Sequence, residues 1–214
     1  MAGIVLHMLA DNVVETGFMV QHKLAYYTIQ TNVWVSILFA YLVIRTFKQK
    51  SKNKEWRIVQ IHPCIHGAIT FYITMTMLGF WTLLAPTTGV PSNRFLLMNT
   101  ILLHLITPLL AIGDYFFFCK HGNLKKIDAC KWMAYPLGYL FFVIVYSQCI
   151  KEPYYSFQLK NRTIDLMYPY PFLDPNVLGF FNVAIAIVIL CIVFYLIARI
   201  FIYIDSKIGR EKKR

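Results

Sequence analysis

Charged residues are scarce in this chain of 214 residues, at 14% of the total, and acidic residues are scarcer still, with 10 Asp and Glu against 21 Lys and Arg. An average soluble domain carries about 25% charged residues. Hydrophobic residues instead make up 58% of the sequence, aromatic residues 16%, and the mean hydropathy is +0.55. This composition excludes an ordinary soluble domain and indicates an integral membrane protein.

Cysteine motifs are also missing. The five cysteines form no CxxC pair and no other spacing typical of a metal site, and most lie in or beside apolar segments. His62 and His66 stand four residues apart and could share a metal ion, but no third ligand is apparent near them. The sequence therefore predicts no metal site and no cofactor.

Long apolar segments dominate what is present. Each has or approaches the about 20 residues that a helix needs to cross about 30 Å of hydrocarbon. A shorter apolar stretch at residues 1–10 precedes Asp11 and Glu15 and lacks the basic start and cleavage site of a secretory signal, so we interpret it as an interfacial segment or the remnant of a first span. The predicted fold is all-α, a polytopic helix bundle forming a single transmembrane domain over residues 1–214, with spans at about 24–44, 65–86, 95–118, 132–150 and 177–204.

Basic residues orient these spans. They gather at residues 45–57, 120–131 and 207–214, whereas the connections at 85–93 and 151–176 hold few. By the positive-inside rule, this alternation predicts an amino end outside and a carboxyl end in the cytosol. Orientation and anionic lipid headgroups account for the net charge of +11, so membrane lipids are the expected partners and nucleic acid is not.

Polar side chains inside a span are costly and therefore mark candidate sites. The first span carries Thr28, Thr31 and Asn32, whose spacing of three and four residues turns all three roughly the same way. These side chains could form one polar site. Helix packing is the alternative, because Ser, Thr, Asn or a lone His commonly bridges membrane helices for about 0.6 to 2 kcal/mol each.

The third span carries His104 in a polar stripe with Thr100 and Thr107. Pro108 lacks the N–H that the carbonyl of His104 would accept, so the helix should bend there and leave that acceptor open. Asp114 could orient His104, but ten residues are about 15 Å of helix rise, so we do not expect direct contact.

A run of prolines and aromatic residues, MYPYPFLDP at 167–175, precedes the last span. It cannot form regular helix, and its rings suit the headgroup zone of a bilayer. We interpret it as a rigid interfacial collar or as a cap over a cavity that opens outward.

Five patches stand in a characteristic order: YYTIQTN (26–32), HPCIHGAITFYITMT (62–76), LLHLITPLLAIGDY (102–115), WMAYPLGYL (132–140) and YPYPFLDP (168–175). Together they resemble the bacterial branch of the androgen-induced-protein-like family of six-span membrane proteins, over residues 26 to about 204. Characterised animal members hydrolyse fatty acid esters of hydroxy fatty acids with a membrane-embedded threonine nucleophile and a histidine on a later span. The family has a complete span before its threonine, where only residues 1–21 are available here, so the chain either starts late or lacks one wall of the bundle.

The resemblance implies that Thr28 is the nucleophile and His104 the base, with Asp114 following the histidine and Tyr170 in the matching outer loop. Thr31 and Asn32 are candidate donors to the oxyanion of an ester intermediate. Thr28 and His104 differ in predicted depth, so they should meet only if the first helix starts before Leu24, near Gly17. A separation above about 8 Å would count against the pair.

The resulting hypothesis is an intramembrane hydrolase of lipid esters in a bacterial cytoplasmic membrane. A small transporter or channel is one alternative, which would place polar groups through the whole bilayer depth. A non-catalytic lipid-binding protein is the other.

Overall fold

The fold is known from a computed structural model, which describes residues 23–53, 59–150, 153–159 and 162–211. The chain divides into two compact units, residues 1–125 with 201–214 and residues 126–200, and each is described by itself. The amino-terminal segment at 1–10 and the helix start near Gly17 lie outside the described residues.

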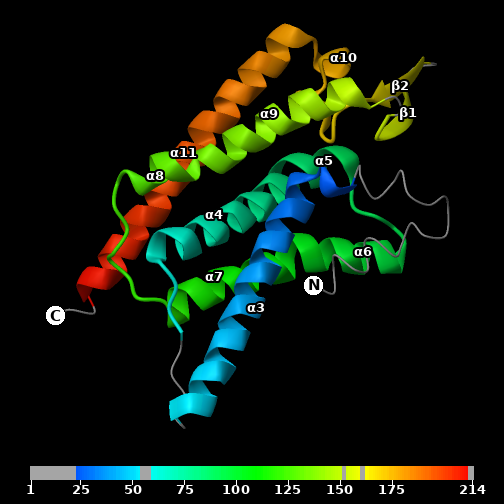
Figure 1. The fold of residues 1–214 in the computed structure, drawn as a ribbon. Coiled ribbons are helices and arrows are strands. Elements are labelled where there is room, and N and C mark those ends of the chain that lie inside the picture. Colours follow the sequence, from blue (N-terminus) through cyan, green and yellow to red (C-terminus); the bar gives the residue numbers. More distant parts are fainter. Residues whose placement is uncertain (1–22, 54–58, 151–152, 160–161, 212–214) are drawn as a thin grey trace. The chain divides into compact units, whose positions relative to one another are not determined.

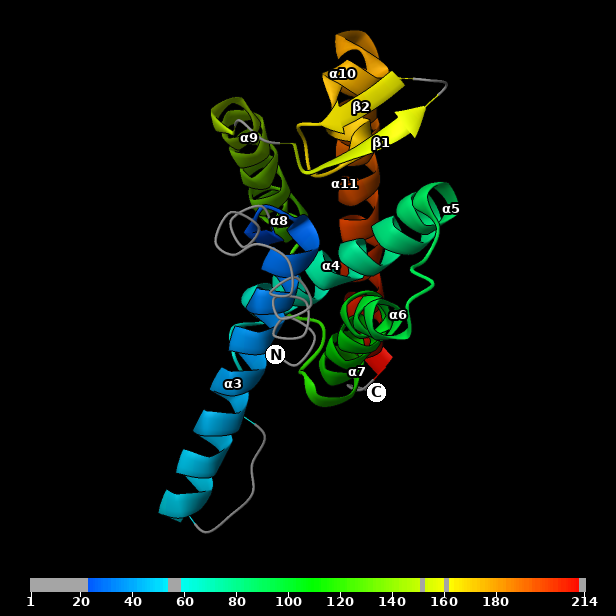
Figure 2. The ribbon, with the colours of Figure 1, turned by 90° about the vertical axis from the view of Figure 1, so that its right-hand side faces the viewer.

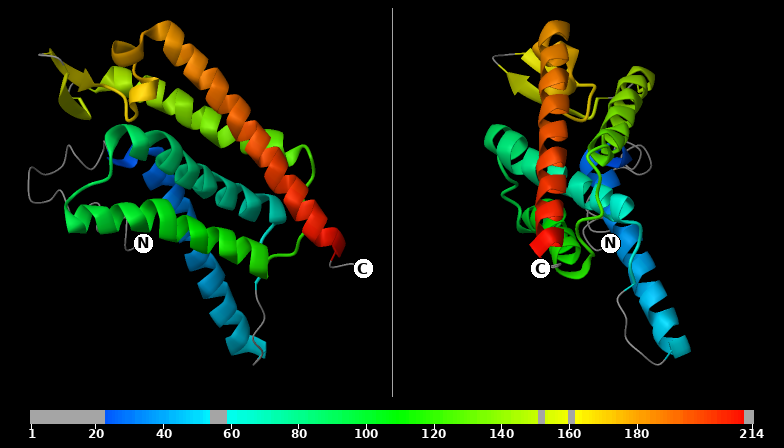
Figure 3. Two further views of the ribbon diagram at one scale, coloured as in Figure 1. Left: turned by 180° about the vertical axis from the view of Figure 1, so that it is seen from behind. Right: turned by 90° about the vertical axis from the view of Figure 1, so that its left-hand side faces the viewer.

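The first unit is built from three long helical stretches (Figure 1). Two of them run antiparallel side by side and the third, α3, packs against both (Figures 1 and 3). Where the three meet, Val35, Ile73 and Ala111 form a buried core. The elements are α3 (Tyr27–Asn53); α4 (Pro63–Gly79), continuing through the π-helix η1 (Phe80–Leu84) into α5 (Ala85–Thr88); α6 (Arg94–Ile101), continuing through the π-helix η2 (Leu102–Ile106) into α7 (Thr107–Phe118); and the end of α11 (Phe180–Glu211).

In its described residues, the second unit contains two long helical segments with a small sheet between them in sequence, and three shorter helical turns (Figure 2). The strands pair antiparallel from Tyr155↔Leu166 to Leu159↔Arg162. Residues 151–176 were predicted to form a loop, and this prediction is wrong for the two strands of the hairpin. The elements are α8 (Asp128–Trp132), α9 (Ala134–Cys149), β1 (Tyr155–Leu159), β2 (Arg162–Leu166), the 3₁₀-helix η3 (Pro171–Leu173), α10 (Pro175–Leu178) and the first part of α11.

Five helical stretches of the described residues are long and apolar enough to cross a membrane: Tyr27–Lys50, Pro63–Thr87, Arg94–Phe118, Asp128–Cys149 and Phe180–Glu211. Large apolar side chains on them face outward, including Phe117 and Phe180, which are 78% and 83% exposed. A bilayer is the solvent that such surfaces require. The prediction of an all-α bundle with five spans is confirmed, and the chain is a multi-pass membrane protein.

Two span boundaries differ from the prediction. Helix α3 continues to Asn53, so Arg45 and Lys48 lie on the helix rather than in a loop. Helix α11 begins only at Phe180, because Gly179 adopts a φ of 77° and ends α10. Long basic side chains can extend from a helix end toward the headgroups, which explains why the apolar segment underestimates the length of α3.

A pair of glycines joins the end of α11 to the loop that follows α7. Gly122 has a φ of +80°. A Cβ placed on Gly209 would lie 2.5 Å from the Cα of Gly122 and 2.7 Å from the carbonyl carbon of His121. These are backbone atoms that cannot rotate away. The approach therefore requires glycine at position 209.

Gly209→Ala is expected to destabilise the first unit by about 1 to 3 kcal/mol, the usual cost of overpacking. The measurement is the unfolding of purified protein in detergent by titration with sodium dodecyl sulfate. Gly79→Ala is the matched control, since its Cβ would meet nothing within 4 Å. That control should be neutral or stabilising by up to about 1 kcal/mol. Equal destabilisation by both variants would contradict the glycine contact.

Candidate functional site

The two residues predicted as nucleophile and base lie together. Thr28 stands in the first turn of α3, and its Oγ1 lies 3.3 Å from Nε2 of His104 in η2. Both side chains are partly buried. The contact is far inside the 8 Å limit and forms from a helix that starts at Tyr27, after a turn at Ala25 and Tyr26.

The contact made by Nδ1 of His104 determines which of the two ring nitrogens carries the proton in the neutral imidazole. Nδ1 lies 3.0 Å from the carbonyl oxygen of Thr100. A carbonyl oxygen can only accept, so Nδ1 must donate. In the neutral ring, Nε2 then presents its lone pair to the hydroxyl of Thr28, which is the tautomer that a general base needs.

The carbonyl oxygen of His104, which was predicted to be left open by Pro108, accepts a hydrogen bond from a side chain. The indole Nε1 of Trp81 donates to the carbonyl oxygen of His104 at 3.0 Å. Phe80 stacks on the imidazole with ring centroids 3.9 Å apart. Two aromatic residues of η1 therefore fix both the ring and the main chain of His104.

Both helical stretches widen into a π-helix where these contacts form. Pro86 follows η1 by two residues, and Pro108 follows η2 by two. A proline removes one helical hydrogen bond and crowds the preceding turn, which favours such a widening. Single π turns inside α-helices frequently occur at functional sites.

Thr31 and Asn32 hold Thr28 in place. The amide nitrogen of Asn32 donates to the carbonyl oxygens of Thr28, at 2.9 Å, and of Leu103, at 3.2 Å. The hydroxyl of Thr31 lies 3.1 Å from the Thr28 carbonyl and 2.7 Å from the hydroxyl of Thr76. These contacts show that Thr31 and Asn32 position Thr28, and their role as oxyanion donors stays a prediction.

The other predicted supporting residues lie elsewhere. Asp114 does not contact His104, as its spacing indicated, and pairs with His66 instead. Tyr170 belongs to the second unit, where its ring stacks on Phe172 with centroids 5.3 Å apart. Asp174, fully buried, accepts from the backbone N–H of Met167 at 2.9 Å and fixes this irregular segment.

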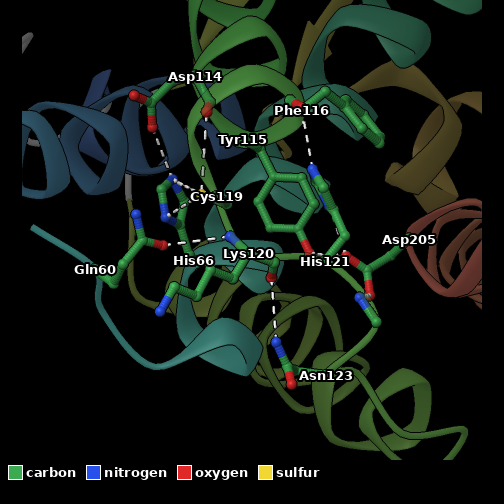
Figure 4. Close-up of polar contacts among 11 residues, drawn as sticks. Gln60, His66, Asp114, Tyr115, Phe116, Cys119, Lys120, His121, Asn123 and Asp205 are labelled. Atoms are coloured by element: carbon green, nitrogen blue, oxygen red, sulfur yellow. Dashed lines mark hydrogen bonds and ion pairs between the residues drawn. The ribbon is translucent and has the colours of Figure 1, made fainter. Parts of the chain in front are cut away.

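A second polar cluster lies where α4 begins and α7 ends (Figure 4). Nε2 of His66 lies 2.9 Å from Oδ2 of Asp114. The sulfur of Cys119 lies 3.0 Å from Nδ1 and 3.8 Å from Nε2 of the same ring. His62, the partner that the sequence offered to His66, is exposed and accepts from the backbone N–H of Cys64.

The surroundings of this cluster are largely apolar. Burial, followed by the charges of Asp114 and Asp205, raises the pKa of the Cys119 thiol to about 12. The free thiol is therefore protonated at neutral pH. A cavity of about 280 Å³ adjoins the three side chains, and Leu42, Val43, Phe47 and Phe118 are among the residues that line it.

A third cluster surrounds Asp205 of α11, which is fully buried. Oδ1 accepts from the hydroxyl of Tyr115 and from Nδ1 of His121, and Oδ2 accepts from the N–H of Gly122, each at 2.9 Å. Nε2 of His121 lies 3.0 Å from the carbonyl oxygen of Phe116. Both ring nitrogens of His121 therefore face protein acceptors. Figure 4 shows this cluster beside the His66 cluster.

Neither a protein-family model, a curated protein nor a solved structure matches this chain. The candidate function therefore rests on the side chains themselves. Among the three clusters, the contact of Thr28 with His104 joins a hydroxyl to an imidazole whose lone pair points at it, which is the arrangement of an activated nucleophile.

Proposed function

We propose that this protein is an intramembrane hydrolase of lipid esters, in which Thr28 is the nucleophile and His104 the general base. The observation that carries the proposal is the 3.3 Å contact between Thr28 Oγ1 and His104 Nε2, with Nδ1 committed to the carbonyl of Thr100. Nucleophile, base and a group that orients the base are the three parts of this kind of site.

The proposed reaction has two stages. His104 takes the hydroxyl proton as Thr28 Oγ1 attacks the ester carbonyl, and the imidazolium then returns the proton to the leaving alkoxide. Water, deprotonated by the same imidazole, next attacks the carbonyl of the acyl-threonine, and the imidazolium returns this proton to Oγ1 of Thr28 as the fatty acid is released.

The position of the pair inside two membrane spans supports a lipid substrate. Acyl chains can reach such a site from the bilayer. The resemblance adds fatty acid esters of hydroxy fatty acids as the substrate class. The placement of basic residues supports a cytosolic carboxyl end, and the resemblance supports a bacterial cytoplasmic membrane.

Labelling with a fluorophosphonate probe tests the proposal. We expect the wild-type protein in detergent to be labelled, Thr28→Ala to be unlabelled, and Thr28→Ser to keep labelling because it retains the hydroxyl. Thr74→Ala is the matched control, since the Thr74 hydroxyl only donates to the carbonyl of Thr70 at 2.7 Å. It should be labelled like the wild type.

Two outcomes would refute the hydrolase. One is labelling that survives Thr28→Ala. The other is a folded wild-type protein that neither takes the probe nor cleaves esters, which would favour the transporter or lipid-binding alternatives. Gel filtration of each variant excludes loss of the fold as the cause.

A further inference from the structure

The cluster at the far end of α7 offers three metal-ligand types at one point. His66, Asp114 and Cys119 each present one ligand atom, and these atoms all lie within 4.8 Å of one another. Imidazole, carboxylate and thiolate are the side chains that bind zinc in proteins. About ten residues of helix, roughly 15 Å, separate Asp114 from His104, so this cluster is distinct from the proposed ester site.

The position of the sulfur decides between two readings of these side chains. In a relay of thiol, imidazole and carboxylate, Sγ would lie on the lone-pair axis of Nδ1 and therefore roughly 5 Å from Nε2. The observed distances are 3.0 Å to Nδ1 and 3.8 Å to Nε2, so the sulfur lies well off the lone-pair axis of Nδ1. A nucleophilic thiol activated by His66 does not fit this placement.

The three side chains can surround a tetrahedral ion bound to Nδ1 of His66. With metal bonds of about 2.0 to 2.3 Å, a ligand nitrogen lies about 3.6 Å from a sulfur and about 3.3 Å from an oxygen. The sulfur of Cys119 lies 3.0 Å from Nδ1, whereas Oδ2 of Asp114 lies 2.9 Å from Nε2, so the carboxylate must rotate toward the sulfur to share this ion. The Asp114 side chain is 25% exposed and lines the cavity, which leaves room for that rotation.

Charge also favours a divalent cation. One carboxylate and one thiolate neutralise a doubly charged ion, and buried charges persist when they are paired or bound to metals. The adjoining cavity of about 280 Å³ leaves room for a fourth ligand such as water.

We propose that Nδ1 of His66, a carboxylate oxygen of Asp114 and the sulfur of Cys119 bind a divalent transition metal ion, zinc by preference, with a fourth coordination position open to the cavity. The site ties the start of α4 to the end of α7. Gln60 supports this junction by donating to the carbonyl of Phe118 at 2.9 Å and accepting from the N–H of Lys120 at 3.3 Å.

Cobalt substitution tests the site. The full chain, purified in detergent and stripped with chelator, would be titrated with Co²⁺ and then with Zn²⁺. We expect one equivalent of Co²⁺ to give a thiolate-to-cobalt charge-transfer band with tetrahedral visible bands, which Zn²⁺ abolishes. Cys119→Ser should remove the charge-transfer band, and Cys119→Ser, His66→Gln and Asp114→Asn should each weaken Zn²⁺ binding at least about tenfold, since even outer-shell changes cost that much.

Cys64→Ser and His62→Gln, substitutions at the same end of α4 outside the trio, are the matched controls and should bind as the wild type does. A wild-type protein without the charge-transfer band would overturn the proposal, whatever the variants do. So would a band that survives Cys119→Ser or is lost equally in Cys64→Ser. Fluorophosphonate labelling of Thr28 in Cys119→Ser, expected to persist, separates failure of this site from failure of the ester site.

Discussion

His104→Gln is expected to lower kcat/KM for hydrolysis of p-nitrophenyl octanoate by about 10²- to 10⁴-fold, the usual contribution of a general base. Glutamine cannot take the proton that the Thr28 hydroxyl, 3.3 Å away, must lose. The loss should fall mainly on kcat, because the imidazole acts in the transition state more than in substrate binding. Release of p-nitrophenolate by protein in micelles measures it.

His62→Gln supplies the control for this measurement, since it makes the same chemical change at an exposed histidine outside the site. Its kinetics should match those of the wild type. A His104→Gln variant that keeps its fold and its kcat would contradict the assignment of His104 as the base.

Asp205→Ala is expected to lower the free energy of unfolding of the first unit by about 3 kcal/mol or more, because it removes the acceptor of three donors, and an unsatisfied buried donor costs about 1 to 3 kcal/mol. The substitution leaves the His121 ring, the Tyr115 hydroxyl and the N–H of Gly122 without their shared acceptor. Unfolding by sodium dodecyl sulfate, read from tryptophan fluorescence, gives the change.

Two further variants are expected to lower the free energy of unfolding by less than Asp205→Ala does. Tyr115→Phe removes a single hydrogen bond to a charged group and should cost about 1.5 to 3 kcal/mol. Glu211→Ala changes an exposed acid at the end of the same helix and should stay within about 0.5 kcal/mol of the wild type. If Asp205→Ala were as mild as Glu211→Ala, the cluster would not hold α11 in the first unit.

The membrane spans could be predicted because their signal is local. An apolar segment of about 20 residues is typical of a membrane-spanning helix, and all five predicted segments overlap such helices. The open acceptor at His104 was predictable for the same reason, because Pro108 removes one particular N–H. Its partner Trp81 was not, since it lies 23 residues away on another helix.

The pairing of Thr28 with His104 came from a resemblance between ordered patches rather than from spacing. From their predicted depths, Thr28 and His104 were expected to meet only if the first helix started before Leu24. They meet although α3 starts at Tyr27. Spacing also failed for the two clusters at the other end of α7. Cys119 is 53 residues from His66, and Tyr115 is 90 from Asp205, so only the packing of separate helices brings them together.

The hairpin at β1 and β2 was missed because its two strands of five residues lie within a connection that looked like an ordinary loop. The sequence also does not show which acidic residue pairs with which basic residue when the two lie on different helices. Asp114 was considered only for His104, on its own helix, whereas the structure gives it to His66 on α4.

The π-helix η2 fixes the angular phase between two faces of one span. His104 must point toward α3, while Asp114, ten residues later, must point toward α4. Each residue of an α-helix turns the chain by about 100°, so shortening η2 by one residue would swing everything beyond it by that amount. Such a deletion could leave either the imidazole or the carboxylate correctly aimed, but not both. Insertions and deletions should therefore be excluded from this turn more strictly than substitutions of its apolar side chains.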